Sequence, residues 1–177
     1  KAVHIALNAE PALEGGLRIL DVGCGTGAPT LLLARHAGGT ILAIDNCQPH
    51  LDELMRRARE EGLSDRVHPR LVDIREPIGD MGPFDLIWSE GVLSLSTGFP
   101  EGLALCRRLL APGGRLGVTE LCWLRPDPPQ ECKAFFDVVF PAITDVETNL
   151  GLIRDAGLET IDHFTLPESS WLDEFYR

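Results

Sequence analysis

The sequence has no surplus of positive charge and no long apolar run. Its 16 Lys and Arg residues face 27 Asp and Glu residues, which gives a formal net charge of −11. Proteins that bind nucleic acid neutralise phosphates with a basic face, so a nucleic-acid partner is disfavoured. No apolar run approaches the ~20 residues of a membrane span, and no signal peptide is recognisable. We therefore expect no membrane partner.

Cysteine pairs and metal-binding spacings are also absent. The five cysteines form no C-x-x-C pair, and their odd number leaves one thiol unpaired in any disulfide framework. A chain of 177 residues needs no disulfides to stabilise its core. The five histidines are scattered, so we expect no metal site. Reduced thiols indicate a cytoplasmic protein.

Length and patterning favour one α/β domain over residues 1–177. Short apolar runs alternate with amphipathic stretches, which predicts a doubly wound, mostly parallel sheet with helices on both faces. Pro69 marks the third strand as an edge. Strands are expected at 18–22, 40–45, 66–73, 84–89, 115–122 and 158–166, and helices at 2–9, 28–37, 49–61, 100–110, within 126–141, at 144–156 with Thr144 and Glu147 at capping-box spacing, and at 169–176.

The turn after the first strand contains three glycines at alternate positions, Gly23, Gly25 and Gly27. Glycines let the backbone turn sharply and let a ligand approach without a Cβ in the way. The following helix directs its first N–H groups into the same crevice, where open parallel sheets bind their ligands. The turn alone also fits the GxGxxA pattern of a dinucleotide dehydrogenase, with Ala28 as the last position.

Three carboxylates at the ends of successive strands narrow the choice of ligand. Asp21 precedes the first glycine by two residues, where a carboxylate suits a cationic amino group better than a pyrophosphate. Asp45 ends the second strand and suits ribose hydroxyls, a feature shared with NAD sites. Asp73 follows the third strand, where it is placed to accept from an adenine amino group.

Five segments between Leu17 and Glu120 resemble, in order and at ordinary spacings, the motifs of class I S-adenosylmethionine-dependent methyltransferases. The segments are LDVGCGTG, AID, VDI, FDLIWSEGVLSL and LLAPGGRLGVTE. More narrowly, the chain resembles the small-molecule methyltransferases of ubiquinone and menaquinone biosynthesis. No seventh, antiparallel strand is recognisable after Leu166, so we expect the C-terminal part of the domain to be incomplete.

The resemblance implies S-adenosylmethionine as cofactor and methyl transfer to a small-molecule acceptor, with S-adenosylhomocysteine as product. By resemblance, Asp21 and the glycine turn hold the methionine moiety, Asp45 the ribose, and Asp73 the adenine. The implied cofactor-binding residues are Asp21, Gly23, Cys24, Gly25, Thr26, Gly27, Asp45, Asn46, Asp73, Ile74, Ser89 and Gly91. The NPPY signature of adenine or glutamine methylation is lacking after Ser89, which argues against a DNA-adenine methyltransferase.

Glu90 ends the fourth strand at the crevice and is the candidate catalytic residue. It either acts as a base or orients the acceptor, or it only hydrogen-bonds the cofactor or a nearby N–H group. A base is needed only when the acceptor must lose a proton. The other interpretation leaves the chemistry to positioning alone.

An aromatic stretch, Trp123, Phe135, Phe136 and Phe140, has two interpretations. The segment 123–144 is either a lid over a partly apolar acceptor or a surface that packs on the sheet edge or on a homodimer partner. Other functions stay open: a methyltransferase acting on RNA or protein, an NAD(P)-dependent oxidoreductase, and a partner subunit that keeps the fold without catalysis.

Overall fold

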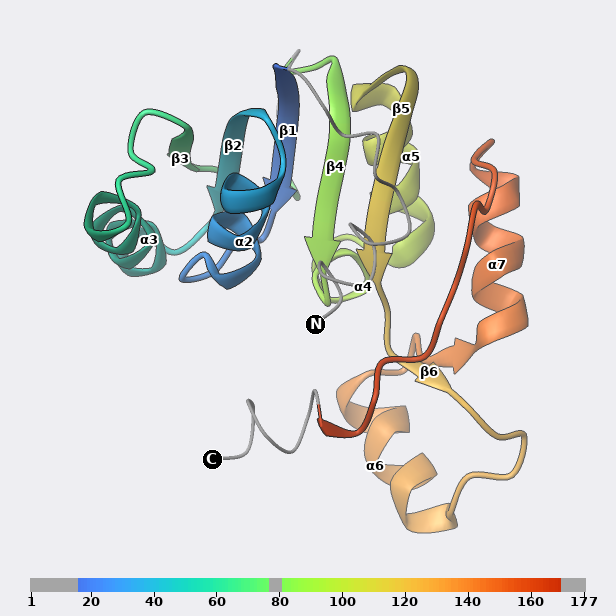
Figure 1. Cartoon of the computed structure of the whole chain (residues 1–177). Coiled ribbons are helices and arrows are strands. Elements are labelled where there is room, and N and C mark those ends of the chain that lie inside the picture. Colours follow the sequence, from blue (N-terminus) through green and yellow to red (C-terminus); the bar gives the residue numbers. More distant parts are fainter. Residues whose placement is uncertain (1–15, 77–80, 170–177) are drawn as a thin grey trace.

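The computed structural model describes residues 16–76 and 81–169. Five strands form one parallel sheet in the order β3-β2-β1-β4-β5 (Figure 1). The order reverses between β1 and β4, which makes their carboxyl ends the switch point of the fold. The elements are β1 (Leu17–Val22), α2 (Ala28–His36), β2 (Gly39–Asp45), α3 (Gln48–Glu60), β3 (Val67–Leu71), β4 (Phe84–Glu90), α4 (Leu93–Ser96), α5 (Phe99–Leu109), β5 (Leu110–Thr119), β6 (Cys122–Trp123), α6 (Gln130–Val139), β7 (Thr144–Asp145) and α7 (Val146–Asp155).

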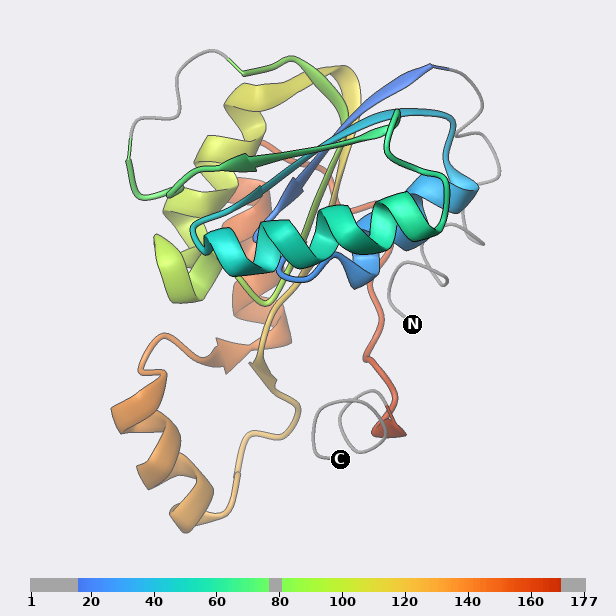
Figure 2. The same cartoon turned by 90° about the vertical axis from the view of Figure 1, so that its left-hand side faces the viewer.

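The central strands are apolar because both faces of the sheet are covered. Ile19 and Ile41 are fully buried in a cluster beneath α2 and α3, while Leu20 and Ile87 are fully buried in a second cluster beneath α5. Figure 2 shows the two helical layers on opposite faces of the sheet. Burial on both sides explains why these strands are near-continuous apolar runs rather than alternating ones.

The predicted fold class is confirmed, and so are the first four strands and the helices that accompany them. β3 is an edge strand, as Pro69 predicted. β5 begins earlier than expected: Leu110 pairs with Phe84 and Arg115 pairs with Leu86, so residues 111–114 bulge out of the ladder. The strand also ends earlier, and Cys122 belongs to β6.

Two expectations about the C-terminal part are wrong. Among the described residues there is no strand over 158–166, where the chain runs without sheet pairing and is mostly exposed. α7 begins at Val146, and Asp145 caps it instead of Thr144: its Oδ1 accepts from the backbone N of Thr148 at 2.8 Å. Thr144 instead pairs with Cys122 in the two-stranded β6–β7 ladder.

The expected helix at 2–9 and nearly all of the one at 169–176 lie outside the described residues. Over the described ranges, no helix is both long and apolar enough to cross a bilayer.

Candidate functional site

The turn between β1 and α2 needs glycine at its first and last positions. Gly23, Gly25 and Gly27 all have positive φ, at 69°, 52° and 86°. A Cβ on Gly23 would lie 2.4 Å from a methyl group of Val92, and one on Gly27 would lie 2.1 Å from a methyl group of Leu54. Neighbouring elements therefore press directly on the backbone of the turn, which only glycine permits.

Hydrogen bonds fasten this turn to the end of β2. The N–H of Cys24 donates to the carbonyl of Ile44 at 3.0 Å. The N–H of Gly25 donates to Asp45 Oδ2 at 2.9 Å, and the N–H of Cys47 donates to Asp45 Oδ1 at 2.9 Å. Asp45 thus orders the glycine turn as well as the loop that follows β2. Cys24 itself is buried in the core, in agreement with a packing role.

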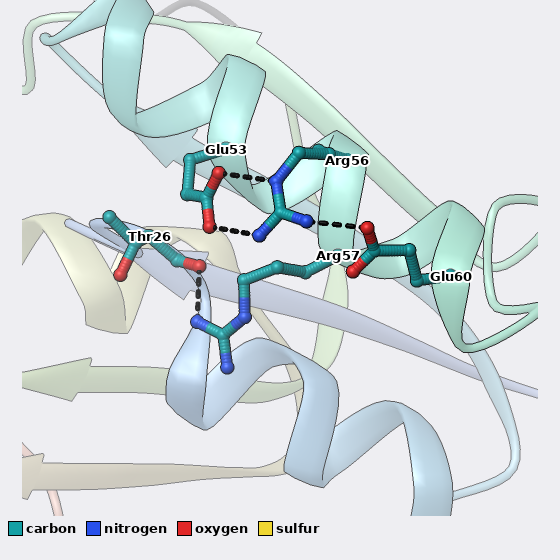
Figure 3. A network of polar contacts seen from close by, with 5 residues as sticks. All are labelled: Thr26, Glu53, Arg56, Arg57 and Glu60. Carbon is teal, nitrogen blue, oxygen red and sulfur yellow. Dashed lines mark hydrogen bonds and ion pairs between the residues drawn. The ribbon is translucent and has the colours of Figure 1, made fainter.

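α3 holds the turn from its outer side (Figure 3). Arg57 Nη1 donates to the Thr26 carbonyl at 2.8 Å. The preceding residue of α3, Arg56, lies between Glu53 and Glu60 and forms ion pairs of 2.6 and 2.5 Å with them. The exposed pairs add little stability. The Arg57 contact joins α3 directly to the predicted cofactor turn.

Asp21 lies beneath the turn and is almost fully buried. Thr30 Oγ1 of α2 donates to Asp21 Oδ2 at 2.5 Å. Burial, with lesser contributions from Glu90 and Asp45, raises the pKa of Asp21 to about 7. In the structure the Asp21 carboxylate lies against α2. Its contact with a ligand amino group stays a prediction.

An open cleft of about 220 Å³ lies at the carboxyl ends of β1, β2, β3 and β4. Six predicted cofactor residues line it: Gly23, Asp45, Asn46, Asp73, Ile74 and Gly91. The remaining six, Asp21, Cys24, Gly25, Thr26, Gly27 and Ser89, do not line this cleft. Across residues 16–76 and 81–169, no group of three or more His, Cys, Asp or Glu side chains could hold a metal ion.

Asp73 enters the cleft wall as an ionised carboxylate. Arg75 Nη2 lies 2.5 Å from Asp73 Oδ2, and Arg75 Nε donates to Oδ1 at 2.9 Å. These hydrogen bonds lower the pKa of Asp73 to about 2. The carboxylate therefore stays an acceptor at any physiological pH.

Glu90 is exposed at the end of β4 and is held by a hydrogen bond from Trp88. Trp88 Nε1 donates to Glu90 Oε1 at 3.0 Å, while the indole itself packs in the core. Within residues 16–76 and 81–169, no hydrogen bond to Glu90 Oε2 is present. Ser89, one of the implied cofactor-binding residues, is fully buried, and its hydroxyl donates to the Val22 carbonyl at 3.3 Å.

Sequence reasoning missed several residues of the cleft wall. His50 lines the cleft, and its Nδ1 lies 3.4 Å from Asp45 Oδ1. A signal existed, because His50 falls in the first turn of α3, directly after the strand that ends at Asp45. α4, which contributes Leu95 and Ser96 to the cleft, was not predicted, because a helix of four residues is too short to show a helical period in the sequence.

A second carboxylate was also missed, at the end of β5. Glu120 Oε1 accepts from the Ser94 N–H at 3.3 Å, and Oε2 accepts from the Ser94 hydroxyl. Burial raises the pKa of Glu120 above its ordinary value. The position of Glu120 directly after an apolar strand could have identified it, because the same rule selected Glu90. In the sheet, Glu90 and Thr119, the residue before Glu120, are register partners.

The aromatic residues gather on α6 and β6, beyond the carboxyl ends of β4 and β5 (Figures 1 and 2). Trp123 and Phe136 meet edge to face with ring centroids 5.5 Å apart, and Phe135 meets Phe136 at 5.3 Å. None of the ten residues of α6 is buried, and Phe135 is 60% exposed. α6 therefore does not pack on the sheet.

Comparisons with known proteins agree with this geometry. A family described as a methyltransferase domain matches residues 19–114, more than half of the chain. A curated relative, the methyltransferase GfsG of Streptomyces halstedii, is 31% identical over 163 residues, which cover 91% of this chain and 54% of GfsG. The chain spans 41% to 54% of the length of the first three curated relatives that it matches.

Solved structures show the same fold. The [4+2]-cyclase SpnF is 31% identical, with a TM-score of 0.74 over 90% of this chain and 57% of SpnF. An S-adenosylmethionine-dependent methyltransferase from Geobacter sulfurreducens, in complex with S-adenosyl-L-homocysteine, is 24% identical, with a TM-score of 0.83 over 98% of this chain and 70% of that one. The second likeness shows the fold alone. Because the family match covers more than half of its residues, this chain belongs to the methyltransferase-domain family.

Proposed function

We propose that this protein transfers a methyl group from S-adenosylmethionine to a small-molecule acceptor and releases S-adenosylhomocysteine. One observation carries the proposal: the cleft at the switch point joins the glycine turn to two ionisable strand-end carboxylates, Asp45 and Asp73. Carboxylates at these positions accept from hydroxyl and amino groups. Family membership supports methyl transfer over hydride transfer, and the acidic charge of the chain favours a small acceptor over RNA.

The described residues fit this cofactor. Gly23 and Gly91 both line the cleft, and the space where a Cβ on Gly91 would lie is open, as a close ligand approach requires. In the proposal Asp45 and Asn46 hold the ribose, Asp73 and Ile74 hold the adenine, and the glycine turn with Gly91 holds the methionine part. Asp21 then acts from below the turn, through its hydrogen bond with Thr30, rather than by contact with the cofactor. When bound, the cofactor supplies a methyl group already activated on a sulfonium.

The chain itself has to orient the acceptor and exclude water. Positioning of this kind lowers a barrier by at most ~7–11 kcal/mol. We assign Glu90 the role of accepting the acceptor's proton at Oε2, since Oε1 is held by the indole N–H of Trp88. Glu90 itself does not line the cleft, but the next residue, Gly91, does, and the exposed setting of Glu90 leaves its side chain accessible.

We further propose that residues 17–122 form the cofactor-binding core and that residues 123–144 close over a partly apolar acceptor. α6 supports this role because it lies beyond the carboxyl ends of β4 and β5 and leaves Phe135 and Val138 exposed, at 60% and 81%. Exposed apolar groups beside a concave site are typical of small-molecule recognition.

A second candidate is a reaction that uses the same fold without methyl transfer. SpnF, which is 31% identical, is named a [4+2]-cyclase. For such a protein the cleft would bind a ligand, but no methyl group would leave it.

The first measurement tests which cofactor binds, and the second separates the two candidates. S-adenosylhomocysteine should raise the melting temperature of the protein, while NAD should not. Incubation with methyl-labelled S-adenosylmethionine and a metabolite extract should then yield a labelled small molecule. A stabilising effect of NAD alone would refute the proposal, and binding without any label transfer would favour the second candidate.

A further inference from the structure

The short helix α4 lies between the cofactor cleft and the end of β5, and one carboxylate joins the two. Leu95 and Ser96 of α4 line the cleft. Glu120, the residue after β5, accepts from both the backbone N–H and the hydroxyl of Ser94. Glu120 is only partly exposed, and its contacts with Ser94 are its side chain's only hydrogen bonds within the described residues.

α4 is too short to keep its position by itself. It spans four residues, Leu93–Ser96, and a helix of one turn is unstable in isolation because nucleation costs more than one turn of hydrogen bonds returns. The N–H groups of a first turn lack intrahelical partners, and Glu120 supplies an acceptor for one of them. Packing also attaches α4, because Leu93 is fully buried against Gly102 of α5.

On its other side Glu120 leads into the segment that carries α6. Cys122 Sγ lies 3.5 Å from the Glu120 carbonyl, and Asn149 Nδ2 of α7 donates to Cys122 Sγ at 3.1 Å. Cys122 also pairs with Thr144 across β6 and β7. Glu120 thus stands where the wall of the cofactor cleft meets the base of the segment 123–144.

We propose that Glu120 is a positioning residue whose carboxylate holds α4 in the wall of the cofactor cleft and joins that wall to the segment 123–144. The inference rests on the proposed function. Its role differs from that of Glu90, which is exposed and bonded to an indole. Loss of the Glu120 carboxylate frees Ser94 and lets α4 move, so ligand affinity falls more than the rate of the chemical step.

The position of α4 can be tested without any ligand. In hydrogen exchange, E120A should lower the protection of residues 93–97 by about tenfold or more, as expected for a lost hydrogen bond to a charged group. Protection of α2 should not change. E120Q retains a carbonyl oxygen for the Ser94 N–H and should restore part of the protection. The double variant E120A/S94A should lose no more than E120A. E147A removes an exposed carboxylate of α7 and serves as the control.

The link to the cleft is tested by titration with S-adenosylhomocysteine. E120A should bind it about tenfold more weakly than the wild type, while E147A binds it equally; with an acceptor in hand, KM should rise more than kcat falls. Equal affinity or unchanged exchange in E120A overturns this inference and leaves the proposed function standing. A wild-type protein that binds no S-adenosylhomocysteine overturns the proposed function, whatever the exchange experiment shows.

Discussion

The two ends of the proposed site are built in different ways. Around the glycine turn, backbone groups and buried side chains hold one another: Gly25 and Cys47 both donate to Asp45, and Thr30 donates to Asp21. On the proposed acceptor side, α6 buries none of its side chains, and Phe135 is largely exposed. Both regions lie at the carboxyl ends of the same sheet.

This difference separates what the fold fixes from what it leaves variable. A rigid turn presents the same donors to any cofactor of one kind, so its residues follow from backbone geometry. An exposed helix with apolar side chains can be changed at little cost to stability. Substitutions around the glycine turn should therefore have large effects on stability or cofactor binding. Substitutions in α6 should affect only the binding of the acceptor.

The largest expected effect is on turnover, and it tests whether Glu90, between the glycine turn and the segment 123–144, takes part in the chemical step. E90Q keeps the size of the side chain and an oxygen for the Trp88 indole, but it removes the base. Turnover should fall by about 10²–10⁴-fold, while the affinity for S-adenosylhomocysteine changes less than twofold. Steady-state kinetics and calorimetry measure the two quantities. Equal turnover in E90Q would leave Glu90 only an orienting role.

The next prediction concerns the rigid turn. Gly27 and Gly62 both have positive φ, at 86° and 68°, but a Cβ would meet Leu54 at the first and open space at the second. G27A should therefore lose about 2–3 kcal/mol in the free energy of unfolding, and G62A only about 1 kcal/mol. Urea denaturation measures both. Equal losses would show that α3 does not press on the turn.

The same contrast explains what the sequence could reveal. The glycine turn, Asp45 and Asp73 were predictable because a parallel sheet brings strand ends together, whatever the side-chain details. Ser89 could not be placed from its neighbours, since its burial depends on the pairing of β4 with β1. His50 and α4 were missed because the path of the preceding loop brings each of them to the cleft. A local sequence pattern does not show the path of a loop.

At the C-terminal end the limit was different. The segment 158–166 contains residues that favour strands, such as Ile161 and Phe164, but a local pattern cannot show whether a strand pairs with a neighbour. Within the described ranges this segment joins no strand, although β5 is an edge of the sheet. Asp145, and not Thr144, is the N-cap of α7, because its carboxylate accepts from both the N–H and the hydroxyl of Thr148. Such competition between adjacent capping residues is decided by geometry.

A smaller effect should appear as a pH dependence of the rigid region. The pKa of Asp21 is raised from 3.8 to about 7 in the folded state, so between these values the folded protein binds more protons than the unfolded chain. Stability from this group is therefore greatest at low pH and falls as pH rises from about 4 to 7, by about 1 kcal/mol per unit.

The variant D21N isolates this contribution. It still offers Thr30 an oxygen but has no proton to lose, so its unfolding free energy should fall less steeply over the same pH range than that of the wild type. Denaturation at several pH values gives both slopes. Parallel slopes for the two proteins would mean that Asp21 stays ionised beneath the turn.

The smallest effect on stability belongs to the acceptor side. F135S removes a ring that is 60% exposed and contacts Phe136 edge to face, so the unfolding free energy should change by no more than about 0.5 kcal/mol. If the segment 123–144 closes over an apolar acceptor, KM for that acceptor should nevertheless rise severalfold, while affinity for S-adenosylhomocysteine is unchanged. A change in stability with no change in KM would instead assign Phe135 to packing. The glycine turn and the segment 123–144 would then differ in burial but not in the ligand that each binds.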